Sequence, residues 1–189
     1  MNQAPLLRIA GATLQRGGRI LLQGFDLQLD AGEAAVLTGP NGVGKSSLIR
    51  MAAGLIAPEA GTVERQPAAL ADEGLALEGR QSLASALGFW TRMDGGDLQP
   101  ALADMGLLPL APVPVGMLST GQRKRAMLAR VIASGAPLWL LDEPANGLDA
   151  DGRARLEQAV ARHRAGGGAV LLATHQPVDL PGARAVQLA

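Results

Sequence analysis

The apolar residues in the first part of the chain fall into short runs of strand type. Gly17-Gly18 and the turn-forming residues 30–33 separate these runs. The runs occupy residues 6–10, 20–22 and 25–29, and a weaker one occupies residues 62–64. The first three predict a small antiparallel sheet, and residues 62–64 predict one further strand.

Runs that are apolar without polar interruption occur again further along the chain. Such runs are typical of strands buried inside a sheet. They occupy residues 34–37, 138–141 and 169–174. Stretches with helical periodicity lie between these runs, at residues 47–53, 123–132 and 153–163.

Between residues 66 and 114 the pattern weakens, because Ala, Gly, Leu and Pro dominate. Helices are predicted there only near residues 82–90 and 98–105. We interpret most of this region, together with the helical stretch at residues 123–132, as a helical insertion. It covers approximately residues 78–133 of a single domain that spans residues 1–189.

Composition excludes several classes of function. Lys+Arg and Asp+Glu cancel at 17 each, so no polybasic face favours nucleic acid or anionic lipid. The absence of cysteine excludes disulfides, thiolate metal sites and cysteine nucleophiles. No apolar run approaches the roughly 18 residues of a membrane span, and no secretion signal opens the chain. We therefore expect a protein on the cytoplasmic side with no nucleic-acid partner.

One stretch fits G-x-x-x-x-G-K-[ST], a loop that binds phosphate when a strand precedes it and a helix follows. Its residues are Gly39, Pro40, Asn41, Gly42, Val43, Gly44, Lys45, Ser46 and Ser47. Amides at the helix N-terminus point at the anion, Lys45 adds positive charge, and the Ser46 hydroxyl can ligate Mg²⁺. The alternative, a glycine-rich turn that binds nothing, is disfavoured by the flanking strand and helix.

Two carboxylates and a histidine follow the later apolar runs. Asp142 and Glu143 come after residues 138–141, at the strand end where open α/β sheets bind ligands. The Asp142 carboxylate can hold Mg²⁺. Glu143 can reach beyond the phosphate and polarise the water that attacks it. His175 follows residues 169–174 and can reach a γ-phosphate. Taken singly, these residues also fit an acidic surface turn and a turn histidine.

A further motif opens a helix at Leu118-Ser119-Thr120-Gly121-Gln122, with Ser119 in the N-cap position. Alone it describes an ordinary capped helix. The chain resembles the ATP-binding subunit of ABC transporters in carrying five motifs in a fixed order. They are the phosphate loop, Leu118–Gln122, Leu141-Asp142-Glu143-Pro144, Gly147-Leu148-Asp149 and His175. The resemblance covers nearly the whole chain. It implies a P-loop NTPase fold of α/β class: a RecA-like core, an antiparallel β-subdomain and an inserted helical subdomain.

The resemblance also implies the ligands, ATP and Mg²⁺, and a role for each residue. Lys45 and the loop amides bind phosphates, while Ser46 and Asp142 hold Mg²⁺. Glu143 is the catalytic base for in-line attack of water on the γ-phosphoryl group, and His175 senses that group.

Other residues act across a head-to-tail homodimer that ATP closes, according to the same resemblance. Ser119 and Gly121 contact the γ-phosphate bound by the partner subunit, and Gln122 belongs to the same nucleotide-binding motif. Asp149 links the two sites of the dimer.

Two features depart from the family. Its members usually stack an aromatic side chain from the first strands on adenine, and residues 14–18 contain none. The guanidinium plane of Arg16 can stack instead, or Arg16 is simply exposed. The family also carries a glutamine between its core and helical lobes, whereas residues 73–81 offer only Gln81, in an unfamiliar setting.

Within the family, Thr174-His175-Gln176-Pro177 is most similar to the ATP-binding subunit of the haem exporter of cytochrome c maturation. Phe89-Trp90 and residues 151–156 and 166–168 share this similarity. It implies a peripheral ATPase on the cytoplasmic face of the inner membrane, bound to integral membrane permease subunits. Two alternatives stay open: the ATPase of another small exporter, of lipoproteins or peptides, and a soluble ABC-type assembly ATPase without a permease.

Overall fold

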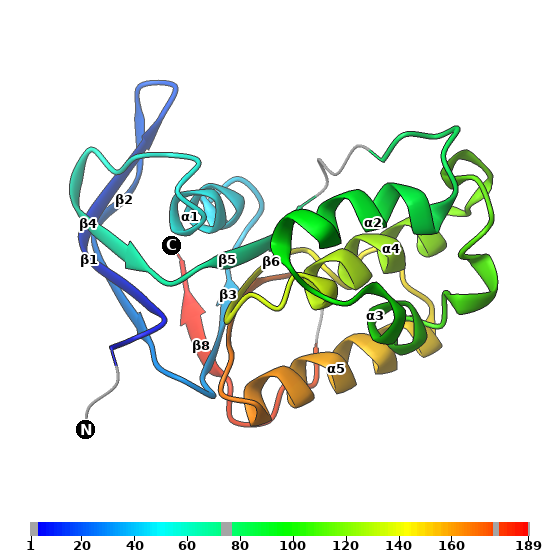
Figure 1. Cartoon of the computed structure of the whole chain (residues 1–189). Coiled ribbons are helices and arrows are strands. Elements are labelled where there is room, and N and C mark those ends of the chain that lie inside the picture. The colour runs from blue at the N-terminus through cyan, green and yellow to red at the C-terminus, as the bar shows by residue number, and fades with distance from the viewer. Residues whose placement is uncertain (1–3, 73–76, 176–177, 189) are drawn as a thin grey trace.

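The computed structural model describes residues 4–72, 77–175 and 178–188 of the chain. Two β-sheets and a helical region lie next to one another (Figure 1). The first strands of the chain occupy one flank, the helices from its middle occupy the other, and the second sheet runs between them. Parts of two predicted motifs, residues 73–76 and 176–177, lie outside the described residues.

The first sheet is antiparallel, with the strand order β2-β1-β4. Its strands are β1 (Leu7–Arg16), β2 (Arg19–Leu29) and β4 (Ala60–Arg65). The runs predicted at residues 20–22 and 25–29 belong to the single strand β2. Gly24 between them has a φ of 64°, and the register with β1 shifts nearby, so the strand bends without ending.

The second sheet is parallel, with the strand order β5-β6-β7-β3-β8. Its strands are β3 (Ala34–Thr38), β5 (Ala68–Ala71), β6 (Leu138–Asp142), β7 (Ala169–Ala173) and β8 (Arg184–Gln187). The three central strands coincide with the uninterrupted apolar runs. The apolar pattern did not predict β5 or β8, which are short edge strands: β5 is mostly half-buried and β8 is mostly exposed.

The helices lie between the strands in sequence. They are α1 (Lys45–Ala52), α2 (Leu83–Asp94), α3 (Leu98–Asp104), α4 (Thr120–Ala133) and α5 (Ala150–Ala165), with short 3₁₀ turns η1 (Leu108–Leu110) and η2 (Val115–Met117). The elements from α2 to α4 fall within residues 78–133. That this range forms a separate subdomain stays a prediction.

The parallel sheet separates two hydrophobic cores. Leu138 and Leu140 of β6 face the core shared with α1 and the antiparallel sheet. Trp139 and Leu141, on the opposite face of the same strand, pack in the core under α2 to α5. Alternate residues of a strand point to opposite faces, so a strand with a core on each side must be apolar at every position. The carboxyl ends of β3, β6 and β7 emerge together, and the predicted motifs follow them.

Candidate functional site

The phosphate loop connects β3 to α1 and closes on its own lysine. Lys45 is buried, and its Nζ donates hydrogen bonds to the carbonyl oxygens of Gly39 at 2.7 Å and Pro40 at 3.1 Å. Gly39 has a φ of 139°, and a Cβ there would lie 2.5 Å from the Leu188 carbonyl oxygen. No side chain caps the N-terminus of α1. The first amides of that helix are therefore available to an anion.

Asp142 stands at the end of β6 and accepts a hydrogen bond from the Ser46 hydroxyl at 3.1 Å. Burial raises the pKa of Asp142, and the neighbouring charge of Glu143 raises it further, against the lowering effect of the Ser46 bond. A cation beside this carboxylate would offset the cost of its burial. Carboxylate and hydroxyl oxygens are ligands that suit Mg²⁺.

The described residues contain no cluster of three or more His, Cys, Asp and Glu side chains that could hold a metal ion alone. A magnesium ion held by one or two protein oxygens takes its other ligands from water and substrate phosphates. Ser46 and Asp142, next to a phosphate loop, therefore fit Mg²⁺ that arrives with a nucleotide.

Glu143 and His175 form a pair across the ends of β6 and β7. Glu143 Oε1 lies 2.9 Å from His175 Nδ1, and the His175 amide donates to Glu143 Oε2 at 3.4 Å. Glu143 has a φ of 47°, the only non-glycine residue with positive φ among those described. Its own amide donates to the Ala173 carbonyl at 2.8 Å, which helps to hold this conformation. Such strain in a non-glycine residue is concentrated at functional sites.

These segments line one cavity of about 380 Å³. It is lined by Leu21, Asn41, Gly42, Gly44, Lys45, Ser46, Ser47, Glu143, Asn146 and His175. The structure thus brings together the phosphate loop, Glu143 and His175, which are far apart in the sequence. Sequence reasoning missed Leu21 and Asn146. Leu21 comes from β2, and only the fold places that strand beside the loop.

The other predicted nucleotide contacts are not among the residues that line this cavity. Ser119 and Gln122 form a capping box at the start of α4: the Ser119 amide donates to Gln122 Oε1 at 2.8 Å, and the Gln122 amide donates to Ser119 Oγ at 3.2 Å. Asp149 caps α5 by accepting from the Gly152 amide at 2.8 Å. Arg16 pairs with Arg19 at the exposed end of the β1–β2 hairpin.

Gln81 lies on the helical flank. Together with Phe89 and Trp90 it lines a different cavity from the one that contains the phosphate loop. Nothing in its described surroundings links it to the Ser46 and Asp142 pair.

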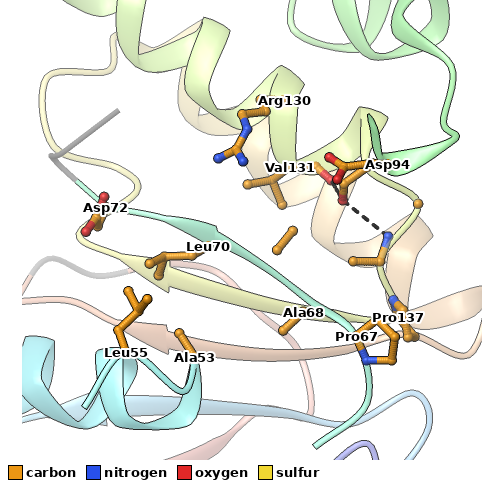
Figure 2. Close-up of a pocket in the computed structure, with 14 residues that line it drawn as sticks. Ala53, Leu55, Pro67, Ala68, Leu70, Asp72, Asp94, Arg130, Val131 and Pro137 are labelled. Atoms are coloured by element: carbon orange, nitrogen blue, oxygen red, sulfur yellow. Dashed lines mark hydrogen bonds between the residues drawn. The ribbon is translucent and has the colours of Figure 1, made fainter. Parts of the chain in front are cut away.

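A larger cavity, of about 700 Å³, runs along the outer edge of β5. Figure 2 shows Arg130 of α4 on one side of it and Leu55, which follows α1, on the other. The Arg130 guanidinium also lies 4.4 Å above the ring of Trp90. The cavity lacks the phosphate loop and the Glu143–His175 pair, so we place the chemistry in the smaller one.

The site can be compared with known proteins. The family model described as ABC transporter matches residues 22–146. The chain belongs to the ABC transporter family. Its fold is the P-loop NTPase fold of ABC ATPases, which confirms the prediction from sequence. As a member of this family the chain binds ATP and hydrolyses it.

Individual ABC proteins match most of the chain. The cytochrome c biogenesis ATP-binding export protein CcmA of Sphingopyxis alaskensis is 53% identical over 180 residues, 93% of each chain. That of Novosphingobium aromaticivorans is 55% identical over 175 residues, 92% of this chain and 91% of its own. A solved ATP-binding subunit of an ABC transporter superposes with a TM-score of 0.83 at 25% identity, over 90% of this chain and 79% of its own. Among the described residues of this ABC protein, no helix has the length and apolar character needed to cross a membrane.

Proposed function

We propose that this chain is the ATP-hydrolysing subunit of a membrane complex that exports or releases haem for cytochrome c biogenesis. The pathway is supported by relatives named for cytochrome c biogenesis export that match more than nine tenths of the chain. The observation that carries hydrolysis is the Glu143–His175 pair at 2.9 Å, facing the phosphate loop in one cavity.

In the proposed site, Lys45 exchanges its two loop carbonyls for phosphate oxygens, and the first amides of α1 hold the same anion. Ser46 and Asp142 hold Mg²⁺, which neutralises charge that develops on the phosphate oxygens. Burial removes hydration from the Asp142 carboxylate and raises its pKa. A bound cation would stabilise the ionised carboxylate in place of the lost water.

Glu143 orients the attacking water and takes its proton. The water oxygen bonds to the γ-phosphorus while the bond from that phosphorus to the β–γ bridging oxygen breaks, which releases ADP and inorganic phosphate. His175 holds the Glu143 carboxylate through Oε1 and contacts the γ-phosphate. The left-handed backbone of Glu143 aims this carboxylate into the cavity in advance.

The complete site includes a second copy of the chain. Ser119, Gly121 and Gln122 stand at the start of α4, outside the cavity that holds the phosphate loop of the same chain. The capping box uses the amides of Ser119 and Gln122 but not those of Thr120 and Gly121, and the positive end of the helix dipole suits an anion. In a head-to-tail homodimer closed by ATP, this end of α4 meets the γ-phosphate of the partner subunit, and Asp149 lies between the two sites.

Exposed apolar side chains support a membrane partner. Leu55 is 65% exposed at the rim of the β5 cavity. Phe89 and Met93 are 52% and 68% exposed, and their spacing of four residues puts them on one face of α2. We assign this surface to the integral membrane permease subunits, with the chain held at the cytoplasmic face of the inner membrane. Another exporter, or an assembly ATPase without a permease, would use the same catalytic site.

The test is affinity capture of a tagged Glu143→Gln protein from membranes extracted with ATP and Mg²⁺. This variant is expected to bind ATP and stay in the closed dimer. Recovery of haem-exporter membrane subunits supports the proposal. Capture of a different permease would contradict the haem pathway and leave the ATPase assignment intact. Capture of no membrane protein favours the assembly ATPase without a permease. Lys45→Met, which weakens ATP binding, is the matched control.

A further inference from the structure

The start of α4 and the turn before α5 touch within one chain. A Cβ on Gly121 would lie 3.1 Å from the carbonyl oxygen of Gly147, so any side chain there would crowd the Gly147 backbone. The turn that contains Gly147 continues directly from Glu143, whose carbonyl accepts from the Asn146 amide at 3.2 Å. A shift of the α4 N-terminus would therefore press on the segment that carries Glu143.

One arginine of α4 is tied to α5 behind this contact. Arg125 is four residues after Gly121, on the same face of α4. Its Nη1 lies 3.7 Å from Asp151 Oδ2, in the first turn of α5. The Asp151 carboxylate also binds Arg155 Nε at 2.7 Å.

The same two arginines reach the C-terminal end of α3. Arg125 Nη1 donates to the Met105 carbonyl at 3.3 Å, and Arg155 Nη1 donates to the Asp104 carbonyl at 3.2 Å. Cations suit this end of a helix, where carbonyls lack partners. The Arg125 side chain is only 16% exposed, so its orientation is restricted by packing as well as by charge.

The contribution of these ion pairs to stability does not explain why Arg125 and Arg155 converge on Asp151. Asp151 is 59% exposed, and exposed ion pairs contribute little to stability. Arg162, two turns further along α5, makes a shorter pair with Asp104, at 2.8 Å. That pair already connects α5 to α3. The distinctive property of Arg125 is its place next to the Gly121–Gly147 contact.

We propose that Arg125 is a positioning residue for ATP hydrolysis. Through Asp151 it makes the start of α4 and the turn after Glu143 move as one unit. When Ser119 and Gly121 of one subunit engage a γ-phosphate held by the partner, the position of that subunit's own Glu143 changes with them. Any cooperativity between the two sites of the dimer then depends on Arg125. This inference rests on the proposed head-to-tail dimer.

The experiment compares Arg125→Gln with Arg162→Gln, which removes the ion pair between α5 and α3 away from the motif. ATPase rates over a range of ATP concentrations give kcat, KM and the Hill coefficient, and thermal melts measure stability. For Arg125→Gln we expect kcat to fall about tenfold, as for a small displacement of a reacting group. Its Hill coefficient should fall to about 1 from a wild-type value above 1, for which about 2 is the limit with two sites. Arg162→Gln should keep the wild-type kcat and cooperativity, and the melts show how much stability each variant loses.

A second variant tests the same contact if Arg125→Gln folds poorly, and it also breaks the pair between Asp151 and Arg155. Asp151→Asn leaves the bond from Arg125 to the Met105 carbonyl in place and should reproduce the loss of cooperativity. Adding Arg125→Gln to it should lower kcat no further. Equal kinetics for Arg125→Gln and Arg162→Gln, or an active wild type without cooperativity, would overturn the positioning role. A wild-type protein without ATPase activity would instead count against the proposed function.

Discussion

Lys45 provides a quantitative test of the phosphate loop. Its Nζ is bonded to the carbonyl oxygens of Gly39 and Pro40, at 2.7 and 3.1 Å, so it must release both before it can hold a phosphate. Lys45→Met removes the charge and keeps a side chain of similar length in a buried position. The substitution therefore isolates the electrostatic contribution to ATP binding.

The expected loss follows from this exchange. Opposite charges about 4 Å apart attract by about 4 kcal/mol at the effective dielectric constant of a partly buried site. Release of two carbonyl hydrogen bonds costs about 1 kcal/mol each. The net contribution of Lys45 is then about 2 kcal/mol, which corresponds to a Kd for ATP about 30-fold higher in Lys45→Met.

The assay is calorimetric titration of each protein with ATP in EDTA, which prevents Mg²⁺-dependent turnover. Arg8→Met, at an exposed position of β1, is the control for loss of a positive charge elsewhere. It should leave the Kd unchanged. A Lys45→Met protein that is folded and binds ATP within about threefold of wild type would refute the assignment of the loop, since 1.4 kcal/mol is already tenfold.

Three further outcomes are expected. Glu143→Gln should bind ATP normally but lose about 10²- to 10⁴-fold in kcat in a steady-state ATPase assay, the usual contribution of a general base; wild-type turnover would move the base elsewhere. Without nucleotide, Asp142→Asn should be about 1 kcal/mol more stable at neutral pH in urea unfolding, because burial penalises the ionised carboxylate and an amide oxygen still accepts from Ser46; a loss of stability would contradict this. His163 stacks on Trp139 with ring centroids 3.9 Å apart, and burial lowers its pKa, so the unfolded state binds protons more readily and stability should fall as pH drops below about 6.5. Melting curves should show a smaller fall for His163→Phe, and an equal fall would place the titrating group elsewhere.

The sequence by itself determined the central strands, the start of α4 and the order of the motifs. Residues 138–141 had to form a buried strand because a core on each face leaves no position for a polar residue. Ser119 predicted the start of α4 because the cap bond forms within a few residues of chain. In both cases the cause is local, or repeats with a short period, so a linear pattern records it.

The tertiary structure alone decided what depends on distant partners. The edge strands β5 and β8 are held by pairing with β6 and β3. Neither has a distinctive sequence pattern, because β5 is four residues of Ala and Leu in an Ala-rich region and β8 is mostly exposed. The left-handed backbone of Glu143, its bond to His175 and the approach of Leu21 to the phosphate loop all join segments from different strands. The tie between Arg125 and Asp151 likewise exists only once α4 and α5 pack together. Such contacts follow from the relative placement of elements, which no local pattern of residues encodes.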